Sequence, residues 1–298
     1  MPGFDPAGAD ALVARARIAV LVPCLNEQGS VATVVRDFKA ALPGATVYVY
    51  DNDSEDATST TAREAGGVVR REPRRGKGNV VRRMFADIEA DVYVMVDGDD
   101  TYDARAAREM VSTLIEHNLD MVVGSRSSHV HAAYRRGHRL GNRLFALLHR
   151  VLFGSEFEDV FSGYRAMSRR FVKSFPTTSS GFEIEAELTA HALDVKAPST
   201  EVRTEYRARG DDSASKLRTY RDGVRILIRS ILFYKELHPG RFFSALFMVF
   251  ALAGVLAAIP VLSQYADTGQ VLRVPLAVLA ASLEVVAFVC MVAGVILD

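Results

Sequence analysis

Short apolar runs alternate with amphipathic stretches through the first part of the chain. The apolar runs predict strands at Ile18–Pro23, Ala45–Tyr50, Asp91–Val96 and Asp120–Gly124, with a short strand near Val68. The amphipathic stretches predict helices at Ser30–Leu42, with Ser30 as its cap, and at Ala57–Ala65, Asn79–Ile88 and Ala104–His117. Uninterrupted apolar runs are typical of parallel strands that are covered on both faces. The alternating order therefore predicts an α/β domain with a Rossmann-like, mostly parallel sheet and helices on both sides.

The C-terminal part of the chain has a different pattern, with two long apolar segments. Phe242–Ala266 has no charged residue, and Val274–Leu297 has only Glu284. Because about 20 apolar residues span a bilayer core as a helix, we predict two transmembrane helices joined by the loop Asp267–Arg273. A buried hairpin in a soluble core is the alternative. Glu284 is a functional or pairing candidate inside the membrane, or an ordinary acid beside its partner helix.

Basic residues are concentrated on one side of the first span. Arg225, Arg229, Lys235 and Arg241 precede it, whereas the connecting loop has only Arg273. Excess positive charge marks the cytoplasmic side of a membrane protein. We therefore expect a multi-pass protein of the cell membrane whose N-terminal domain lies in the cytoplasm.

Two further segments are both basic and amphipathic. Arg139–Phe153 and Lys216–Leu237 place apolar residues at helical spacing, with arginines around them. Such helices suit a bilayer interface, and ordinary core-facing helices with a solvated basic face are the alternative. We expect three parts: a globular domain at 1–215, an interfacial helix at 216–240 and a two-helix membrane anchor at 241–298.

The composition narrows the function classes. The 298 residues include 36 basic and 36 acidic side chains, and this zero formal charge gives no indication of a nucleic-acid partner. The two cysteines, Cys24 and Cys290, lack the spacing of a disulfide framework or a zinc site. The first residues lack the apolar stretch of a signal peptide.

Acidic residues follow two of the predicted strands. Asp51 and Asp53 come after Ala45–Tyr50, and Asp97 and Asp99 come after Asp91–Val96. In such sheets ligands bind beyond the carboxyl ends of the strands. Neighbouring carboxylates need a compensating cation, and Mg²⁺ or Mn²⁺ takes carboxylate oxygens while leaving positions for substrate phosphates. Asp97 and Asp99 are therefore predicted to hold Mg²⁺ or Mn²⁺ against a nucleoside diphosphate, with an acidic surface turn as the alternative.

The glycine-rich basic stretch RRGKGN, Arg74–Asn79, is a second candidate phosphate contact. It lacks the spacing and the Ser or Thr of a Walker loop. It still places Lys77 where a diphosphate is expected, with a solvated turn as the alternative.

Seven motifs occur in an order that carries a family resemblance. They are LVPCLNE (21–27), YDNDSEDAT (50–58), RGKGN (75–79), DGDDTYD (97–103), GSR (124–126), SGYRA (162–166) and SASKL (213–217). Together they resemble the family 2 glycosyltransferases with the GT-A fold and, more narrowly, the dolichyl- and polyprenyl-phosphate sugar synthases. The resemblance covers about residues 16–236. The two C-terminal spans resemble the membrane anchors of bacterial and archaeal members.

This resemblance implies roles by position. Pro23, Asn26 and Glu27 match the nucleotide-site loop of the family, and Asp51 matches its base- or ribose-binding acid. Asp97 and Asp99 match the metal-binding Asp-x-Asp, and Arg126 matches a position linked to the acceptor phosphate. The residues that fall in the flexible acceptor loop of the family are Arg207, Arg209, Ser215 and Lys216. Asp53 and Lys77 complete the donor-binding set that we expect.

The chain departs from the family pattern at three positions. Asn52 replaces the second acid of the usual Asp-Asp-Gly-Ser, and Asp53 replaces its glycine. Thr101 stands where eukaryotic-type members have a glutamine, two residues beyond the second metal-binding acid. These departures leave the third metal ligand open, with Asp100 as a substitute. Asp103 is expected to begin the next helix, where an acid suits the helix dipole.

The implied reaction is inverting transfer of a sugar from a nucleoside diphosphate to a polyprenyl phosphate. The second pKa of a phosphate monoester is about 6, so this acceptor is mostly a dianion at neutral pH. It therefore needs to be positioned more than it needs a general base. The candidates for that positioning are Arg126, Arg139, Arg143 and Arg207. The motif variants favour a UDP-hexose or UDP-N-acetylhexosamine donor, and GDP-mannose is the alternative.

Other residues and functions stay open. Glu183 and Glu187, four residues apart on one helical face, are candidates for contacts with sugar hydroxyls, as is Asp159 before SGYR. The histidines at 129, 131, 138 and 149 have no ligand spacing and are interpreted as structural. A processive polysaccharide synthase is disfavoured because the chain has no tryptophan, and a non-catalytic membrane scaffold is disfavoured by the intact acid pair. The resemblance also includes homo-oligomers associated through the membrane helices.

Overall fold

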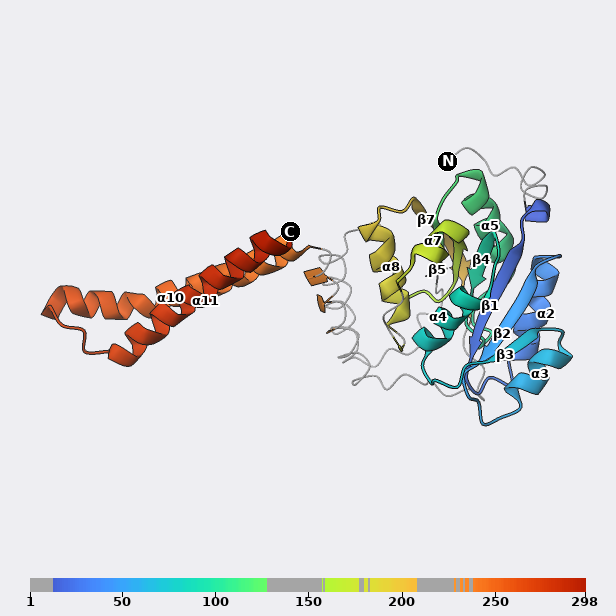
Figure 1. Cartoon of the computed structure of the whole chain (residues 1–298), viewed down its shortest axis with the longest axis horizontal. Helices are drawn as coiled ribbons and strands as arrows, with labels where there is room; N and C mark the ends of the chain where they lie inside the picture. Colours follow the sequence, from blue (N-terminus) through green and yellow to red (C-terminus); the bar gives the residue numbers. More distant parts are fainter. Residues whose placement is uncertain are drawn as a thin grey trace. The chain divides into compact units, whose positions relative to one another are not determined.

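Figure 1 shows the chain as a computed structural model. It describes residues 13–127, 157, 159–176, 180–181, 183–207, 228, 231–232, 234–235 and 238–298. Two compact units make up the chain, Met1–Leu227 and Ile228–Asp298.

The described part of the first unit is built on a seven-stranded sheet. The strands are β1 (Ile18–Cys24), β2 (Thr46–Asp51), β3 (Val68–Arg71), β4 (Val92–Met95), β5 (Met121–Ser127), β6 (Arg165–Ser168) and β7 (Ser199–Glu205). Their order across the sheet is β3-β2-β1-β4-β6-β5-β7. Strands β1 to β4 are parallel, β6 is antiparallel between β4 and β5, and β7 is parallel to β5. The prediction of a mostly parallel α/β sheet is confirmed.

Helices cover both faces of this sheet (Figure 1). One layer is formed by α2 (Val31–Ala41), α3 (Thr58–Glu64) and α5 (Ala106–Glu116), and the other by α4 (Lys77–Asp87), α7 (Arg169–Ser174) and α8 (Ile184–Asp194). Strand β1 shows why its sequence is apolar throughout. Val20 and Val22 pack into the first layer, whereas Ala19 and Leu21 pack into the second. Successive side chains of a strand point to opposite faces, so a strand buried on both faces has no polar position.

The strands and helices predicted between residues 18 and 124 agree with the structure to within three residues at each boundary. Strands β6 and β7 and helix α7 were not predicted. Strand β6 is only four residues long, RAMS, and begins with an arginine, so its sequence lacks an apolar run. Ser30 precedes α2 as expected, but its side chain does not cap the helix. Its Oγ instead donates to the carbonyl oxygen of Gly98 at 2.7 Å.

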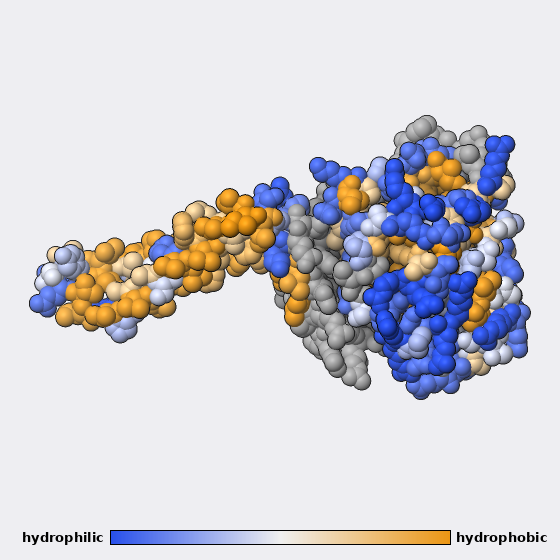
Figure 2. Space-filling view, in the orientation of Figure 1, coloured by the Kyte–Doolittle hydropathy of each residue, from blue (hydrophilic) through white to orange (hydrophobic). Residues whose placement is uncertain are grey.

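The second unit contains a helical hairpin of α10 (Pro239–Thr268) and α11 (Val274–Leu297). Both helices are long and apolar enough to cross a membrane, judged by length and composition. Their outer faces are exposed, with Met248, Leu262 and Val295 at 63%, 64% and 78%. The hairpin surface is mostly hydrophobic, while the visible face of the first unit is mostly hydrophilic (Figure 2).

Mostly small residues line the contact between the two helices. The buried positions are Gly254 and Val261 in α10 and Ala280, Ala287 and Gly294 in α11. Small residues at seven-residue intervals let two helices approach closely along one seam. A Cβ atom at Gly254 would lie 2.5 Å from Oε1 of Glu284. The one acid of the second apolar segment therefore lies against its partner helix.

Two of the predicted segments fall largely or wholly outside the described residues. Arg139–Phe153 lies entirely outside them, and Lys216–Leu237 is described only at residues 228, 231–232 and 234–235. The interfacial role of these basic segments and the division of the chain into three parts stay predictions.

Candidate functional site

The carboxyl ends of three parallel strands bring the predicted donor-site loops to one edge of the sheet. Strand β1 lies between β2 and β4, with Cys24 opposite Asp51 and Leu21 opposite Met95. The loops 25–29, 52–57 and 96–101 therefore leave the sheet at the same edge. A crevice outside the carboxyl ends of such strands is the usual ligand site of an open α/β sheet.

Asp51 and the loop after β1 are held by a set of short-range hydrogen bonds. The buried Asp51 carboxylate accepts from Ser54 N at 3.0 Å and from Ser59 Oγ at 2.6 Å. Asn26 has φ 52°, and its Oδ1 accepts from Glu55 N at 2.8 Å. The two loops therefore form one connected rim, with Asp51 at its base.

Buried Glu27 joins the same rim through its backbone. Its N–H donates to Thr58 Oγ1 at 2.8 Å, and its carbonyl accepts from Val31 N at 2.9 Å at the start of α2. Pro23, four residues earlier in β1, pairs with Tyr50 in the sheet. These contacts fix the LVPCLNE loop between the sheet and two helices.

Asn52 joins the end of β2 to the loop between β3 and α4. Its Nδ2 donates to the carbonyls of Glu72 and Arg74 at 3.0 and 2.7 Å, and its Oδ1 accepts from Gly76 N at 2.6 Å. A carboxylate accepts hydrogen bonds but donates none. The asparagine is thus required by the loop that precedes Lys77, which explains this departure from the family pattern.

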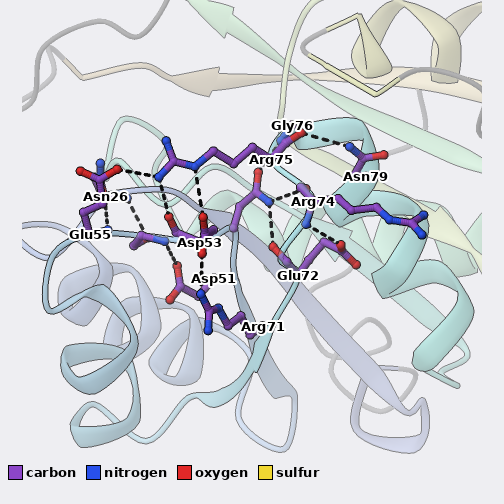
Figure 3. A network of polar contacts seen from close by, with 12 residues as sticks. Asn26, Asp51, Asp53, Glu55, Arg71, Glu72, Arg74, Arg75, Gly76 and Asn79 are labelled. Atoms are coloured by element: carbon purple, nitrogen blue, oxygen red, sulfur yellow. Dashed lines mark hydrogen bonds and ion pairs between the residues drawn. The ribbon is translucent and has the colours of Figure 1, made fainter.

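Asp53 faces arginines from two neighbouring segments (Figure 3). It forms ion pairs with Arg71 and Arg75, and Arg75 also pairs with Glu55 at 2.6 Å. The hydrogen bond from Arg71 is the main cause of the lowered pKa of Asp53. All four groups are solvent-exposed or nearly so, so each pair contributes little to stability. The donor contact expected of Asp53 stays a prediction, since its carboxylate is occupied by these arginines.

The DGDD turn is packed tightly at its glycine. A Cβ at Gly98 would lie 2.5 Å from Cys24 Sγ, so this position has no room for a side chain. Asp99 Oδ1 accepts from Thr101 Oγ1 at 2.7 Å and from Thr101 N at 3.3 Å. Asp97, on the other side of the glycine, is 29% exposed.

Lys77, the first residue of α4, lies between two carboxylates. Its ammonium group contacts Asp97 Oδ1 and Glu185 Oε1, and the side chains of Lys77 and Glu185 are only 9% and 7% exposed. Burial alone would lower the pKa of Lys77, but the charges of Asp97 and Glu185 raise it above its ordinary value. Lys77 is therefore a permanent cation beside the DGDD turn.

The SGYR segment supports the turn from the opposite side. Gly163 leaves space for the Asp97 carboxylate, because a Cβ there would lie 2.6 Å from Oδ2. Arg165 is fully buried and donates to the carbonyls of Val160 at 2.6 Å and Glu185 at 3.0 Å. Burial lowers the pKa of Arg165 to about 10, so it is still charged at neutral pH.

Arg126, near the end of β5, makes a two-pronged ion pair. Its Nε and Nη2 donate to the two oxygens of Asp159, each at 2.7 Å. The guanidinium also lies over the ring of Tyr206 at 5.4 Å. Although burial opposes it, the hydrogen bond with Asp159 raises the pKa of Arg126 above its ordinary value. Arg126 and Asp159, two separate predictions, thus form one unit.

The family of the chain is decided by comparison with known proteins. The sequence profile of glycosyl transferase family 2 matches residues 19–175. Glycosyltransferase AglJ of Haloferax volcanii is 35% identical over 213 residues, which cover 71% of this chain and 70% of that protein. The chain belongs to glycosyl transferase family 2. It is therefore a glycosyltransferase with the GT-A fold.

Further relatives of this family 2 glycosyltransferase include a protein named as a lipid-phosphate sugar transferase. A dolichyl-phosphate hexose transferase of Haloferax volcanii is 29% identical over 210 residues, covering 70% of this chain and 90% of that protein. The solved structure of glucosyl-3-phosphoglycerate synthase from Mycobacterium tuberculosis with Mn²⁺ and UDP-glucose shares the fold. It has a TM-score of 0.64 at 23% identity, over 78% of this chain and 84% of that one.

The acid pair of this family 2 chain fits a hard divalent ion. Among the described residues, no group of three or more His, Cys, Asp or Glu side chains is placed to hold a metal. Magnesium is often bound by one or two carboxylates together with substrate phosphates and water. Asp97 and Asp99 suit an ion that is bound with a diphosphate. Asp100, the expected substitute ligand, has φ 58°, and burial raises its pKa; its role stays a prediction.

Of the remaining predicted site residues, some lie beside the DGDD turn and others fall outside the described part of the chain. Arg207 N donates to Thr101 O at 2.8 Å, and Nη2 lies 3.7 Å from Oδ1 of Asp103. Asp103 lies just before α5, where its Oδ1 accepts from Arg105 N at 3.1 Å. Arg207 therefore lies beside the DGDD turn. The residues outside the described part of the chain are Arg139, Arg143, Arg209, Ser215 and Lys216.

Glu185 is the site residue that sequence reasoning missed. Glu183 and Glu187 were selected by their spacing, and both are buried at the start of α8. Among these three acids, it is Glu185 that pairs with Lys77, from a position 108 residues away in the sequence. No local pattern distinguishes it from its neighbours, because the choice depends on how α8 docks onto α4.

Proposed function

We propose that this glycosyltransferase transfers a sugar from a nucleoside diphosphate to a polyprenyl phosphate at a membrane. The observation that carries the proposal is the placement of Lys77 beside Asp97 at the carboxyl edge of the sheet. There, a buried cation and an acid pair meet where the nucleotide-site loops converge. This is a charge arrangement suited to a diphosphate with a divalent ion.

The donor side of the proposal uses residues of the three loops. Asp51, at the base of the rim, would accept hydrogen bonds from the ribose or base, with Pro23, Asn26 and Glu27 shaping the loop beside it. Asp97 and Asp99 would hold Mg²⁺ or Mn²⁺, which when bound neutralises charge that builds on the leaving diphosphate. Lys77 supplies a fixed positive charge for the same leaving group.

UDP is the favoured nucleotide. A structural relative was solved with UDP-glucose and Mn²⁺, and a sequence relative is named a dolichyl-phosphate hexose transferase. A UDP-hexose or UDP-N-acetylhexosamine is therefore the proposed donor. GDP-mannose is the alternative, since a dolichol-phosphate mannosyltransferase of Pyrococcus furiosus is 24% identical over 213 residues.

The acceptor side rests on arginines and on the hairpin. An acceptor phosphate oxygen attacks the anomeric carbon as the bond from that carbon to the diphosphate breaks, which inverts its configuration. The acceptor is already a dianion, so the residues around it need to position it and screen its charge. Arg207 lies beside the DGDD turn, and Arg126 lies over Tyr206, whose ring packs against Tyr102. Asp159 holds Arg126 in a two-oxygen contact that the acceptor phosphate would replace.

The proposed location follows from the hairpin and the acceptor. A polyprenyl chain is insoluble in water, so an enzyme that uses it gains from an anchor in the same bilayer. Helices α10 and α11 have the length and composition of such an anchor. The excess of basic residues before α10 supports a cytoplasmic first unit.

Radiolabelled sugar transfer tests the proposal. Membranes containing the chain are incubated with polyprenyl phosphate, Mn²⁺ and one labelled donor at a time, and label in the organic extract is counted. We expect lipid-linked product from a UDP-sugar, its loss with EDTA, and at least about a hundredfold loss in Asp97→Asn. Asp194→Asn, an exposed acid at the end of α8, is the control and retains activity.

Other outcomes are informative. Product from GDP-mannose alone would replace the UDP assignment while keeping the reaction class. Absence of an organic-extractable product from every donor would reject the lipid phosphate as acceptor, and full activity of Asp97→Asn would reject the metal assignment.

A further inference from the structure

Lys77 is a buried cation with two counter-charges, and the proposed reaction uses only one of them. Asp97 lies in the DGDD turn and has its own task at the donor diphosphate. Glu185 is less exposed than Asp97, at 7% against 29%, and comes from α8, which lies in the same helix layer as α4. Neither donor binding nor acceptor binding gives Glu185 a role.

Glu185 is itself held firmly. Its backbone carbonyl accepts from Arg165 Nη2 at 3.0 Å and from Thr189 Oγ1 at 3.2 Å. Arg165 in turn donates to Ser162 O at 3.0 Å and to Thr189 Oγ1 at 2.9 Å. A fully buried guanidinium therefore fixes the first turn of α8 to the SGYR segment, and with it the base of the Glu185 side chain.

The start of α4 is fixed to the segment before α8 as well. Gly78 N donates to Gly181 O at 3.2 Å. A Cβ at Gly76 would lie 2.1 Å from Ser180 O, so the two backbones are in direct contact. Lys77 and Glu185 thus extend from two backbone segments that are joined directly at this contact.

This arrangement has an electrostatic consequence. A buried ammonium with a single partner pairs with it fully, because the low-dielectric surroundings offer no alternative. With Asp97 as its sole partner, Lys77 would draw that carboxylate away from a divalent ion. A second, fixed carboxylate keeps the ammonium in place whether or not Asp97 is engaged elsewhere.

We propose that Glu185 is a positioning residue, which holds the ammonium group of Lys77 beside the donor diphosphate and leaves Asp97 available to the donor complex. The inference rests on the proposed function for the identity of the diphosphate. The pairing of Glu185 with Lys77 itself is independent of any substrate.

A double-mutant cycle with Glu185→Gln and Lys77→Met tests this role. We expect Glu185→Gln alone to lower kcat by about tenfold to a hundredfold, the size expected for a misplaced catalytic group. In the Lys77→Met background the same change should lower kcat by less than about twofold, because there is no longer an ammonium to position. Equal losses in both backgrounds would show that Glu185 acts independently of Lys77 and would overturn the proposal.

A thermal-unfolding cycle on the detergent-solubilised full chain, without donor or metal, gives a readout that needs no activity. Lys77→Met leaves Glu185 buried without its cation and should lower Tm by roughly 5 to 15 °C. Adding Glu185→Gln should recover at least half of that loss, since the unpaired charge is removed. If the two losses instead add, the pair is not coupled and the proposal fails.

Two controls separate this proposal from the proposed function. Glu109→Gln removes an exposed glutamate on α5 and should leave Tm and kcat unchanged in both backgrounds. If the wild-type chain forms no lipid-linked sugar while the thermal cycle is coupled, the substrate assignment fails but the pairing stands. Glu185→Asp keeps the negative charge but withdraws it by one methylene. Because the proposed role depends on position, this variant should regain more of the Tm than of the kcat that Glu185→Gln loses.

Discussion

At Gly163 the fold leaves no space for even one methyl group. The missing Cβ would lie 2.6 Å from one oxygen of Asp97 and 3.0 Å from its carboxyl carbon. Gly163→Ala should therefore displace the Asp97 carboxylate and lower transfer by about a hundredfold, the cost of roughly 1 Å of misplacement at a catalytic group. Initial rates at saturating donor and Mn²⁺ measure this loss.

Gly29→Ala is the matched control for that substitution. Gly29 lies in an exposed turn at the same edge of the sheet, and a Cβ there meets nothing within 4 Å. The control should keep wild-type rates and Tm. If Gly163→Ala were as active as Gly29→Ala, Asp97 would not need its present position, and the assignment of Asp97 to the donor site would be in doubt.

Individual residues differ in how far the local sequence indicates their place in the candidate site. The placement of Asp51, Asp97 and Lys77 at one edge of the sheet could be predicted, because acids after parallel strands and a lysine in a glycine-rich loop are recognisable patterns. Glu185 could not, since its selection over Glu183 and Glu187 depends on helix docking. The hydrogen bonds of Asn52 could not be predicted either, because its partners are backbone groups of a loop 20 to 24 residues away.

At the scale of elements, the loop between β3 and α4 depends on a single side chain. Asn52 donates to two carbonyls of that loop and accepts from Gly76 N. Asn52→Asp removes both donors and places a negative charge among carbonyl oxygens. We expect a loss of about 1 to 3 kcal/mol in unfolding free energy and a rise in the KM for the donor, because Lys77 follows this loop directly.

Urea unfolding and donor saturation curves measure the two effects of Asn52→Asp. Asn52→Gln, which keeps the amide on a longer arm, should recover part of the stability but little of the KM. If Asn52→Asp left stability and KM unchanged, the amide would not be needed to hold the loop between β3 and α4. The aspartate of the family pattern would then serve equally well at this position.

The order of elements was predictable to a useful degree. Strands with continuous apolar runs and helices with clear periodicity, such as β1 and α2, are specified by local sequence. Strand β6 is not, because RAMS is short and starts with the buried Arg165, whose charge is satisfied only by partners that the fold assembles. The antiparallel insertion of β6 between β4 and β5 therefore required the tertiary structure.

For the whole molecule, the question is whether the apolar hairpin anchors the chain. Helices α10 and α11 present exposed apolar side chains along their length, including Leu256 at 58% and Val285 at 63%. A lysine near the centre of a membrane helix costs about 2.5 to 3.5 kcal/mol in insertion experiments. The chain with both Leu256→Lys and Val285→Lys should therefore be lost from the carbonate-washed membrane pellet. A chain that ends at Leu227 should be lost from the pellet as well.

The companion measurement separates anchoring from folding. Both altered chains should keep the increase in Tm caused by a UDP-sugar with Mn²⁺, because the donor site is built entirely from the first unit. Transfer to long-chain polyprenyl phosphate in vesicles should fall at least about tenfold, whereas transfer to a short, detergent-dispersed analogue should fall less, since it needs no shared bilayer. Ser282→Ala, an exposed hydroxyl on α11, leaves the apolar surface intact and should remain in the pellet. If the lysine variant also resisted the carbonate wash, the hairpin would be a packing element, and attachment to the bilayer would have to come from another part of the chain.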